Sequence, residues 1–363
     1  MHFQNLIQTI DDGLSGKNEG LPTGLDRLDD YFSIKRRTMV TLAGASGSGK
    51  TQLVNQAFIT EPFKYCFKNQ KKIKIIHFSM ERSIVYTHAK LLSNEIFQQY
   101  GEIISVPLML GWYKDKKLTS SQRDILVEYE SLYDSMEEHI SIYQGQKAPD
   151  QIYAIVSKYA EANGKNIKIN EYESVYVPND PEEYVLVVVD HIGLTKKGKY
   201  GSKKEAIDTL VEFEQKFRDY YGYAVINVSQ INRDLSKIAK DTFAPHLDHL
   251  KETGNIGEAS DCVLTIFDPI RYNTKDENYG DVARFRCENT GHKFFRNITV
   301  LKNSFGIDGI SVGTAFMGET GIFKTLPKAD IVESWTDYDY EKIFNYEYFK
   351  NKYTKPRKQH FEL

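Results

Sequence analysis

Residues 44–51 of this 363-residue chain read Gly-Ala-Ser-Gly-Ser-Gly-Lys-Thr and match the pattern G-x-x-x-x-G-K-[ST] in full. A β-rich run, 37–43, leads into this segment, and a run with helical spacing, 51–59, leaves it. In such a strand–loop–helix unit the glycines let backbone N–H groups point at phosphate oxygens, the lysine reaches the β- and γ-phosphates, and the threonine hydroxyl binds Mg²⁺. The residues expected to hold ATP or a close relative are Gly44, Ala45, Ser46, Gly47, Ser48, Gly49, Lys50 and Thr51.

The composition excludes several classes of protein. With 40% hydrophobic and 27% charged residues, the chain has the composition of a soluble globular protein. Its longest aliphatic run, 185–189, is far shorter than the ~20 residues that cross a bilayer. The N-terminus lacks a signal-peptide pattern, and the three cysteines form no C-x-x-C pair, so we expect a reduced, cytoplasmic protein without membrane contact. Because the net charge is only −3, any nucleic-acid contact must come from local basic loops.

The spacing of apolar residues predicts an α/β fold. Early strands alternate with helices, and later strands follow each other directly, which predicts a mostly parallel central sheet flanked by helices and extended by antiparallel strands. Buried strands are expected at 73–79, 184–190 and 223–229, further β-structure at 165–178, 262–267, 283–288, 298–302 and 310–316, and helices at 5–14, 81–99, 119–137, 150–163 and 203–221.

Three polar residues come directly after predicted buried strands. Asp190 ends the most apolar strand, Glu81 follows the strand at 73–79, and Gln230 ends the strand at 223–229. Ligands of open α/β sheets bind at the carboxyl ends of the strands. Asp190 is therefore expected to orient Mg²⁺, Glu81 to act as general base and Gln230 to sense the γ-phosphate. The residues alone leave simpler interpretations open: a capping Asp190, a helix-starting Glu81 and a solvated or capping Gln230.

Two loops that leave the same strand ends carry basic residues. The loop at 195–204 holds five lysines, among them Lys196, Lys197 and Lys199, and the longer loop at 232–255 includes Arg233. Such loops can follow a phosphate backbone. A charged run is also commonly just a solvated loop, and the composition does not separate the two interpretations.

Six segments, in this order, resemble the ATPase domain of DnaB-type replicative helicases, a branch of the RecA-like family. They are GLPTGLDRLD (20–29), GASGSGKT (44–51), HFSMERS (77–83), VVVDHIGL (187–194), SQINR (229–233) and LKETGNIGEASDCVL (250–264). The last is similar to the family's Leu-Arg-Glu-Ser-Gly-Ser-Ile segment, which contacts single-stranded DNA. The match covers about residues 15–327 and implies a linker helix or arm (1–19), a RecA-like ATPase domain (20–327) and a C-terminal tail (328–363).

The resemblance implies an ATP- and Mg²⁺-dependent helicase, with the three polar residues in the roles given above. In such enzymes six ATPase domains form a ring around one DNA strand, and hydrolysis at the subunit interfaces moves the ring along it. The implied partners are single-stranded DNA, further copies of the chain in a hexameric ring, and a primase or helicase loader. Three further residues fall on positions that in the family line the central channel: Lys251, Glu252 and Gly254.

The chain departs from the family pattern in three places. The family carries Lys-x-Arg-x-Gly on a late strand, and its arginine reaches the neighbouring subunit's γ-phosphate; here residues 302–306 read Lys-Asn-Ser-Phe-Gly. Lys302 remains a candidate catalytic residue, and Ser304 takes the arginine position. Two outcomes stay open: Lys302, Arg284, Arg286 or Arg296 compensates, or hydrolysis is slow or depends on a partner. The helical collar and the primase domain are missing, which suits a stand-alone phage or mobile-element protein. The stretch 100–182 is enlarged and is expected to carry an interaction surface of its own.

Two other functions stay open. A RecA/RadA-like recombinase or recombination mediator shares the Pro-Thr-Gly-Leu-Asp approach and the phosphate loop, but it forms filaments; the Lys-Glu-Thr-Gly segment favours the helicase. A weakly hydrolysing structural or loader-type ATP-binding protein is suggested by Ser304.

Overall fold

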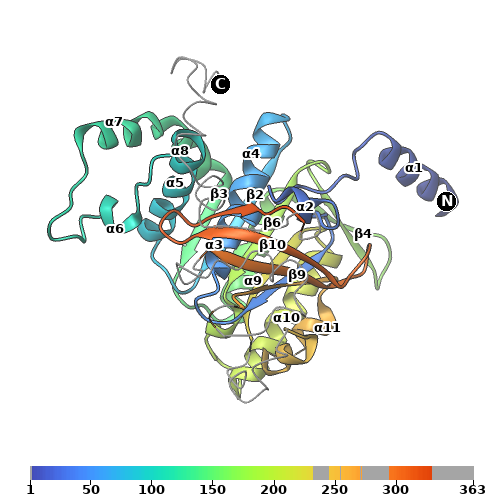
Figure 1. Ribbon diagram of the computed structural model, residues 1–363. Coiled ribbons are helices and arrows are strands. Elements are labelled where there is room, and N and C mark those ends of the chain that lie inside the picture. The colour runs from blue at the N-terminus through green and yellow to red at the C-terminus, as the bar shows by residue number, and fades with distance from the viewer. Residues whose placement is uncertain (1, 232–244, 254, 270, 272–293, 329–363) are drawn as a thin grey trace.

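A nine-stranded β-sheet forms the centre of the molecule (Figure 1). The computed structural model describes residues 2–231, 245–253, 255–269, 271 and 294–328. The strand order is β11-β10-β9-β8-β1-β7-β6-β2-β3; the six strands from β8 to β3 are parallel, and β9, β10 and β11 extend them in antiparallel fashion. The strands are β1 (Met39–Gly44), β2 (Ile73–Ser79), β3 (Ile140–Gln144), β6 (Tyr184–Asp190), β7 (Ala224–Gln230), β8 (Cys262–Phe267), β9 (Phe295–Asn303), β10 (Ile310–Met317) and β11 (Ile322–Thr325).

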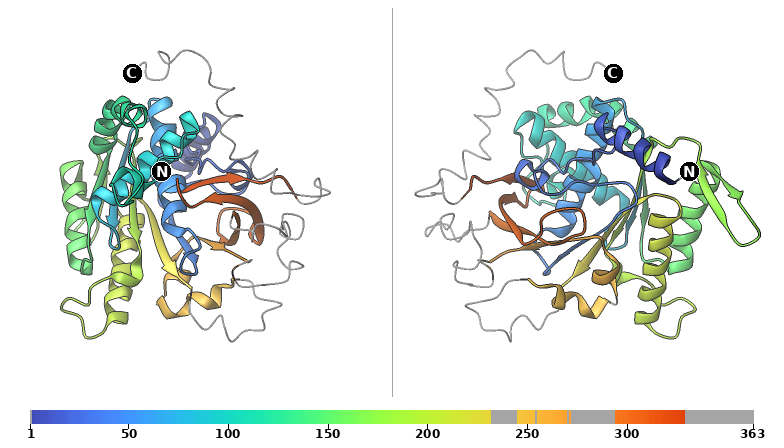
Figure 2. Two further views of the ribbon diagram at one scale, coloured as in Figure 1. Left: turned by 60° about the vertical axis from the view of Figure 1, so that its left-hand side comes forward. Right: turned by 90° about the vertical axis from the view of Figure 1, so that its right-hand side faces the viewer.

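Helices cover both faces of this sheet (Figure 2). Buried apolar side chains form one core on each face. One face packs against α3 (Lys50–Val54), the π-helical turn η1 (Asn55–Thr60), α4 (Glu61–Lys68), α5 (Ile84–Tyr100), α7 (Ser120–Glu128) and α8 (Glu130–His139). The other packs against α9 (Pro149–Ala162), α10 (Lys203–Asp219) and α11 (Ile256–Ala259). Every residue of β1, β6 and β8 is buried, as expected for strands covered on both faces.

Local signals set where the main helices begin. The Ser83 hydroxyl accepts a hydrogen bond from the Tyr86 N–H, so α5 begins at Ile84 and leaves Glu81 outside the helix. The Ser202 hydroxyl caps α10 in the same way. The predicted strands at 73–79, 184–190 and 262–267 are confirmed to the residue.

The stretch 100–182 contains helices, an edge strand and a hairpin. It includes the short helix α6 (Val106–Met109), and its β3 strand was not predicted. The β-structure expected at 165–178 is the separate hairpin of β4 (Gly164–Lys168) and β5 (Ser174–Pro178), whose Tyr176 hydroxyl donates to the Ala160 carbonyl. The strand expected at 283–288 and the tail from 329 lie outside the described residues.

Helix α1 (His2–Leu14) projects from the margin of the molecule in Figure 1. It confirms the helix expected at 5–14. Within the described part of the chain, no helix combines the length and apolar character needed to cross a membrane.

Candidate nucleotide-binding site at the carboxyl edge of the sheet

The phosphate-loop segment connects β1 to α3 at the carboxyl edge of the parallel strands. Its turn into α3 is made by Gly49, which has φ +103°, a left-handed conformation that residues with a side chain rarely adopt. The aromatic rings of Phe316 and Phe323 pack behind Gly49. The loop therefore presents the N-terminal end of a helix at the sheet edge, where backbone N–H groups favour an anion.

Lys50 is a buried cation inside this loop. Its ammonium group donates to the carbonyl oxygens of Gly44 and Ala45 at 2.8 and 2.9 Å. Burial lowers the pKa of Lys50 to about 8, and the negative charges of Asp190 and Glu81 oppose that shift. A buried ammonium is stabilised by an anion, so the position fits the phosphate contact expected from the sequence.

Two carboxylates lie on adjacent strand ends beside Lys50. Ser79 of β2 is in register with Asp190 of β6, and the Met80 N–H donates to the Asp190 carbonyl at 2.8 Å. Burial raises the pKa of Asp190 to about 6; Glu81 adds to this rise, and a hydrogen bond from Thr51 opposes it. Glu81 is exposed, with its carboxylate 3.6 Å from Arg82. The expected metal and base residues therefore converge on one edge.

The fit to Mg²⁺ rests on the chemistry of the donors. The Thr51 hydroxyl and the Asp190 carboxylate are hydrogen-bonded to each other, and both are the oxygen donors that Mg²⁺ prefers. No group of three or more His, Cys, Asp or Glu side chains suited to a metal occurs among the described residues.

Gln230 lies at the same edge, on the strand next to the phosphate loop. It pairs in register with Gly44, and its side-chain nitrogen is 3.4 Å from Nε2 of His191. His191 is buried, and its Nδ1 has no hydrogen-bond partner among the described residues. His191 was not among the predicted site residues, although its position directly after Asp190 places it at this edge.

Arg296 corrects one expectation from the sequence. Its side chain is only 6% exposed, and it donates to the Ser48 carbonyl of its own phosphate loop at 3.0 Å. It also forms an ion pair with Asp268 at 3.1 Å. Arg296 as a substitute finger onto a neighbouring subunit is therefore wrong, because its guanidinium group is buried beside its own phosphate loop and ion-paired there. Arg284 and Arg286 lie outside the described residues.

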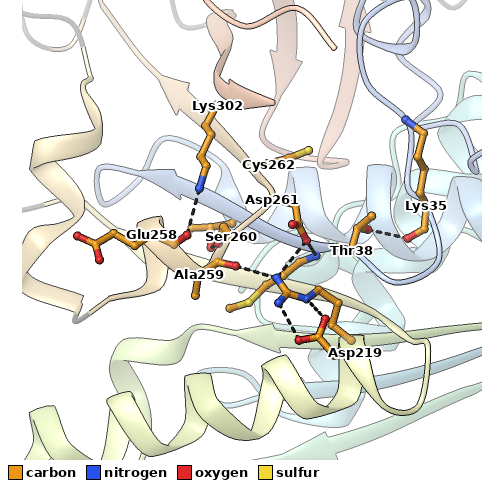
Figure 3. Close-up of polar contacts among 12 residues, drawn as sticks. Lys35, Thr38, Asp219, Glu258, Ala259, Ser260, Asp261, Cys262 and Lys302 are labelled. Carbon is orange, nitrogen blue, oxygen red and sulfur yellow. Dashed lines mark hydrogen bonds and ion pairs between the residues drawn. The ribbon is translucent and has the colours of Figure 1, made fainter. Parts of the chain in front are cut away.

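Lys302 lies at the amino ends of the parallel strands, on the side of the sheet opposite the carboxyl edge that carries the phosphate loop. Strand β9 runs antiparallel to β8, so Lys302 pairs with Val263 near the start of β8. Its ammonium group donates to the carbonyl oxygens of Gly257 and Glu258 at 3.2 and 3.1 Å (Figure 3). The exposed Ser304 follows in the turn after β9. Lys302 is thus separated from its own loop by the length of the sheet strands.

Comparison with known proteins identifies the family. The model of the DnaB-like helicase C-terminal domain matches residues 20–325. The chain belongs to this family.

Solved structures agree with the DnaB-like assignment at the level of the fold. One solved ATPase domain superposes with a TM-score of 0.64 at 18% identity, covering 90% of this chain and 99% of that one. A DnaB-like replicative helicase, described with its interactions with primase, superposes with a TM-score of 0.63 at 19% identity, covering 89% and 66%. No curated protein sequence matches. The predicted RecA-like α/β fold is confirmed.

The residues expected to contact DNA, from the two basic loops and from the family pattern, are only partly described. Lys196 and Lys197 are exposed in the loop after β6, and the Lys196 N–H donates to the Lys147 carbonyl at 2.9 Å. The ammonium group of Lys199 instead pairs with Asp150 of α9 at 3.1 Å. The remaining assigned residues are Lys251 and Glu252, whose backbone belongs to the 3₁₀ turn η4 (Leu247–Thr253), and Arg233 and Gly254, which lie outside the described residues.

Proposed function

We propose that this chain is an ATP- and Mg²⁺-dependent DNA helicase subunit that translocates on single-stranded DNA during DNA replication, as a hexameric ring. The observation that carries the proposal is the convergence of Lys50, Thr51, Asp190, Glu81 and Gln230 at one sheet edge in a DnaB-like fold. Membership of the DnaB-like family does not by itself identify which residues of this chain form a catalytic site. The convergence supplies a phosphate-binding cation, a metal-binding pair, a base and a sensor in one place.

Each residue at this edge has a distinct role in the proposal. Thr51 and Asp190 would hold Mg²⁺, which neutralises charge that develops on the phosphate oxygens. Lys50 binds the β- and γ-phosphates, and the exposed Glu81 carboxylate accepts a proton from the attacking water. Gln230, as both donor and acceptor, contacts the γ-phosphate and passes its state to the segment that follows β7.

The proposed ring rests on two surfaces of the subunit. Because Lys302 lies at the edge opposite its own phosphate loop, the nucleotide that it contacts belongs to another copy. Phe305 and Ile307 in the adjoining turn are exposed, as expected of a surface that a neighbour covers. Contacts between two different edges are head-to-tail, and such contacts form a ring when the rotation between subunits closes and a filament when it does not; the proposed assembly is the closed ring. Linker 1–19 would join the ATPase domain, 20–327, to the neighbour.

The proposed partners on the DNA side follow from the same edge. Lys196 and Lys197 lie in the loop that follows Asp190, directly after the 3₁₀ turn Ile192–Leu194 and Thr195, so a bound strand would lie close to the nucleotide. A primase or a helicase loader is a further proposed partner, since one structural neighbour is described with its primase interactions. A weakly hydrolysing loader-type protein is the second candidate, because Ser304 stands where the family carries its arginine.

Two substitutions test the proposal. Lys50→Ala should abolish binding of a fluorescent ATP analogue, because it removes the phosphate cation. Glu81→Gln should leave binding within about twofold but lower single-stranded-DNA-stimulated ATP turnover by about 100-fold or more, since the base is lost. Glu171→Gln, at an exposed glutamate of the hairpin, is the matched control. Turnover that survives Glu81→Gln would remove Glu81 as the base, and wild-type turnover that ignores DNA would favour the loader-type function.

A further inference from the structure

Arg271 contacts the tip of the phosphate loop from the turn after β8. Its Nη1 donates to the Ser46 carbonyl at 2.6 Å, and its backbone N–H donates to the Asp268 carboxylate at 3.2 Å. A Cβ atom on Gly47, which has φ +78°, would lie 2.3 Å from the same Nη1. The guanidinium group therefore occupies the space that the missing side chain of Gly47 leaves. Nothing in the sequence motif singles out Arg271, because the motif does not fix position 47.

The arginines at this loop carry more positive charge than the nearby carboxylate offsets. Asp268 already pairs with Arg296 at 3.1 Å, and no described carboxylate forms an ion pair with Arg271. Burial lowers the pKa of Arg296; Asp268 opposes this effect, and the charge of Arg271 adds to it. Counted over the described residues, two guanidinium groups close to one carboxylate give a local excess of positive charge, which an anionic ligand at the loop would stabilise.

The donors of Arg271 are suited to phosphate oxygens. A guanidinium group has five N–H donors in a planar fork, and one of them is used on Ser46. The side chain is exposed, so the fork is accessible to a ligand at the loop. By contrast, Arg296 is buried behind the loop, and Lys302 lies at the far edge of the sheet. Among these three cations, Arg271 is the accessible one on the loop of its own chain.

We propose that Arg271 contacts the phosphates of the nucleoside triphosphate bound to its own subunit, while its Ser46 contact holds the tip of the phosphate loop. The site then receives an arginine from its own chain. The neighbouring subunit does not provide one at the family's usual position, because Ser304 stands there. This inference rests on the proposed function, which provides the triphosphate. An arginine of the same chain can stabilise the charge that develops during phosphoryl transfer, as arginines supplied in cis do in other nucleotide hydrolases.

The first test compares single variants. Arg271→Ala should lower kcat/KM for ATP by at least about 10-fold, and Arg271→Lys should restore part of the loss because it keeps the charge without the fork. Arg123→Ala, at an exposed arginine of α7, is the matched control and should change nothing. The Tm without nucleotide should be equal in all three variants. A kcat/KM of Arg271→Ala within twofold of wild type overturns the inference, as does an equal loss in the Arg123→Ala control.

The second test mixes the Lys50→Ala and Arg271→Ala variants, each of which has lower ATP turnover than wild type, to separate cis from trans action. Lys50→Ala subunits retain Arg271 but hold no nucleotide, and Arg271→Ala subunits hold nucleotide without the arginine. If Arg271 acts in cis, the mixture shows no more turnover than the two variants measured separately; turnover above that sum means that Arg271 acts across the interface and overturns the inference. Mixing Lys50→Ala with Lys302→Ala, in which recovery is expected, shows that subunits exchange.

Measuring nucleotide affinity distinguishes a failure of this inference from a failure of the proposed function. If the wild-type chain hydrolyses no ATP, the proposed function fails, and binding of a fluorescent ATP analogue then decides the role of Arg271. Equal affinity in wild type and Arg271→Ala overturns the inference in that case, whereas weaker affinity in Arg271→Ala alone supports it.

Discussion

Glu214 is a carboxyl group buried in the core beneath the parallel strands. It lies on α10, and one of its oxygens accepts a hydrogen bond from the Asn227 side chain at 2.7 Å. The other oxygen, Oε1, has no hydrogen-bond partner among the described residues. Burial raises the pKa of Glu214 from 4.5 to about 8, against the smaller opposing effect of Asn227. Glu214 is therefore protonated in the folded protein near neutral pH.

The consequence is a stability that falls as pH rises. Between pH 4.5 and about 8 the folded chain holds a proton that the unfolded chain has lost, so stability falls by up to about 1.4 kcal/mol per pH unit in this window. Glu214→Gln should flatten this dependence and raise the Tm at pH 8. Thermal unfolding from pH 5 to 8 measures it, with the exposed Glu212→Gln as control. Equal pH profiles for Glu214→Gln and wild type would show that Glu214 is ionised in the core.

Single residues could be predicted where the motif is contiguous. Lys50 and Thr51 follow from one pattern, because their neighbours in sequence are also their neighbours in space. Arg296 could not be placed, since its contact with Ser48 joins segments 248 positions apart. Glu214 carried a signal that was not used: it continues the helical face of Leu210 and Phe217, both buried. The roles of Glu81, Asp190 and Gln230 remain predictions that substitution must test.

At the scale of elements, the burial of a strand determined whether its apolar pattern could be recognised in the sequence. β2, β6 and β8 are almost wholly buried, so their apolar runs had clear ends. β3 was missed because it is a half-exposed edge strand of five residues, and its Ile-Ser-Ile alternation is too short to be distinguished from the surrounding sequence. β11 is a four-residue strand and forms the edge strand on the side of the sheet opposite β3. A strand this short gives too little pattern to recognise.

Helix α1 has an apolar stripe that its own chain leaves exposed. Leu6 is 53% exposed and Ile10 is 48% exposed, and Phe3, Ile7 and Leu14 continue the same helical face. A stripe of this kind is stabilised when a second surface covers it. In the proposed ring, that surface belongs to the neighbouring subunit.

Charges placed on the stripe should therefore weaken assembly. Leu6→Asp with Ile10→Asp removes apolar contacts of about 1.5–3 kcal/mol each, which corresponds to a loss of subunit affinity of about 100-fold or more. Analytical ultracentrifugation should show the variant shifted to smaller species at concentrations where wild type forms rings. Gln4→Asp with Gln8→Asp adds the same charge on exposed polar positions of α1 and should assemble normally. If both pairs assemble like wild type, α1 does not join subunits.

At the scale of the whole molecule, the two edges of the sheet divide the functional surfaces. The carboxyl edge carries the phosphate loop, the carboxylates and the lysines after β6, whereas the opposite edge carries Lys302 and the β4–β5 hairpin. A sequence resemblance supplies the order of such segments but not which edge each one reaches. The sheet register supplies that information: it places the lysines after β6 at the carboxyl edge and Lys302 at the amino ends of the parallel strands.

Lysines at the two edges should accordingly differ in their contribution to DNA binding. Lys196→Ala with Lys197→Ala removes two exposed cations at the carboxyl edge; Lys199 is left intact because it pairs with Asp150. If both cations contact phosphates of single-stranded DNA, the slope of log affinity against log salt should become shallower by about 1.4, at about 0.7 per contact. Fluorescence anisotropy with an oligothymidine, a non-hydrolysable ATP analogue and several salt concentrations measures this slope. Lys165→Ala with Lys168→Ala removes two exposed cations from the hairpin at the other edge and should leave the slope unchanged. Equal changes of slope for both pairs of variants would mean that DNA affinity depends only on the net charge of the protein. The carboxyl edge would then not be the strand-binding face.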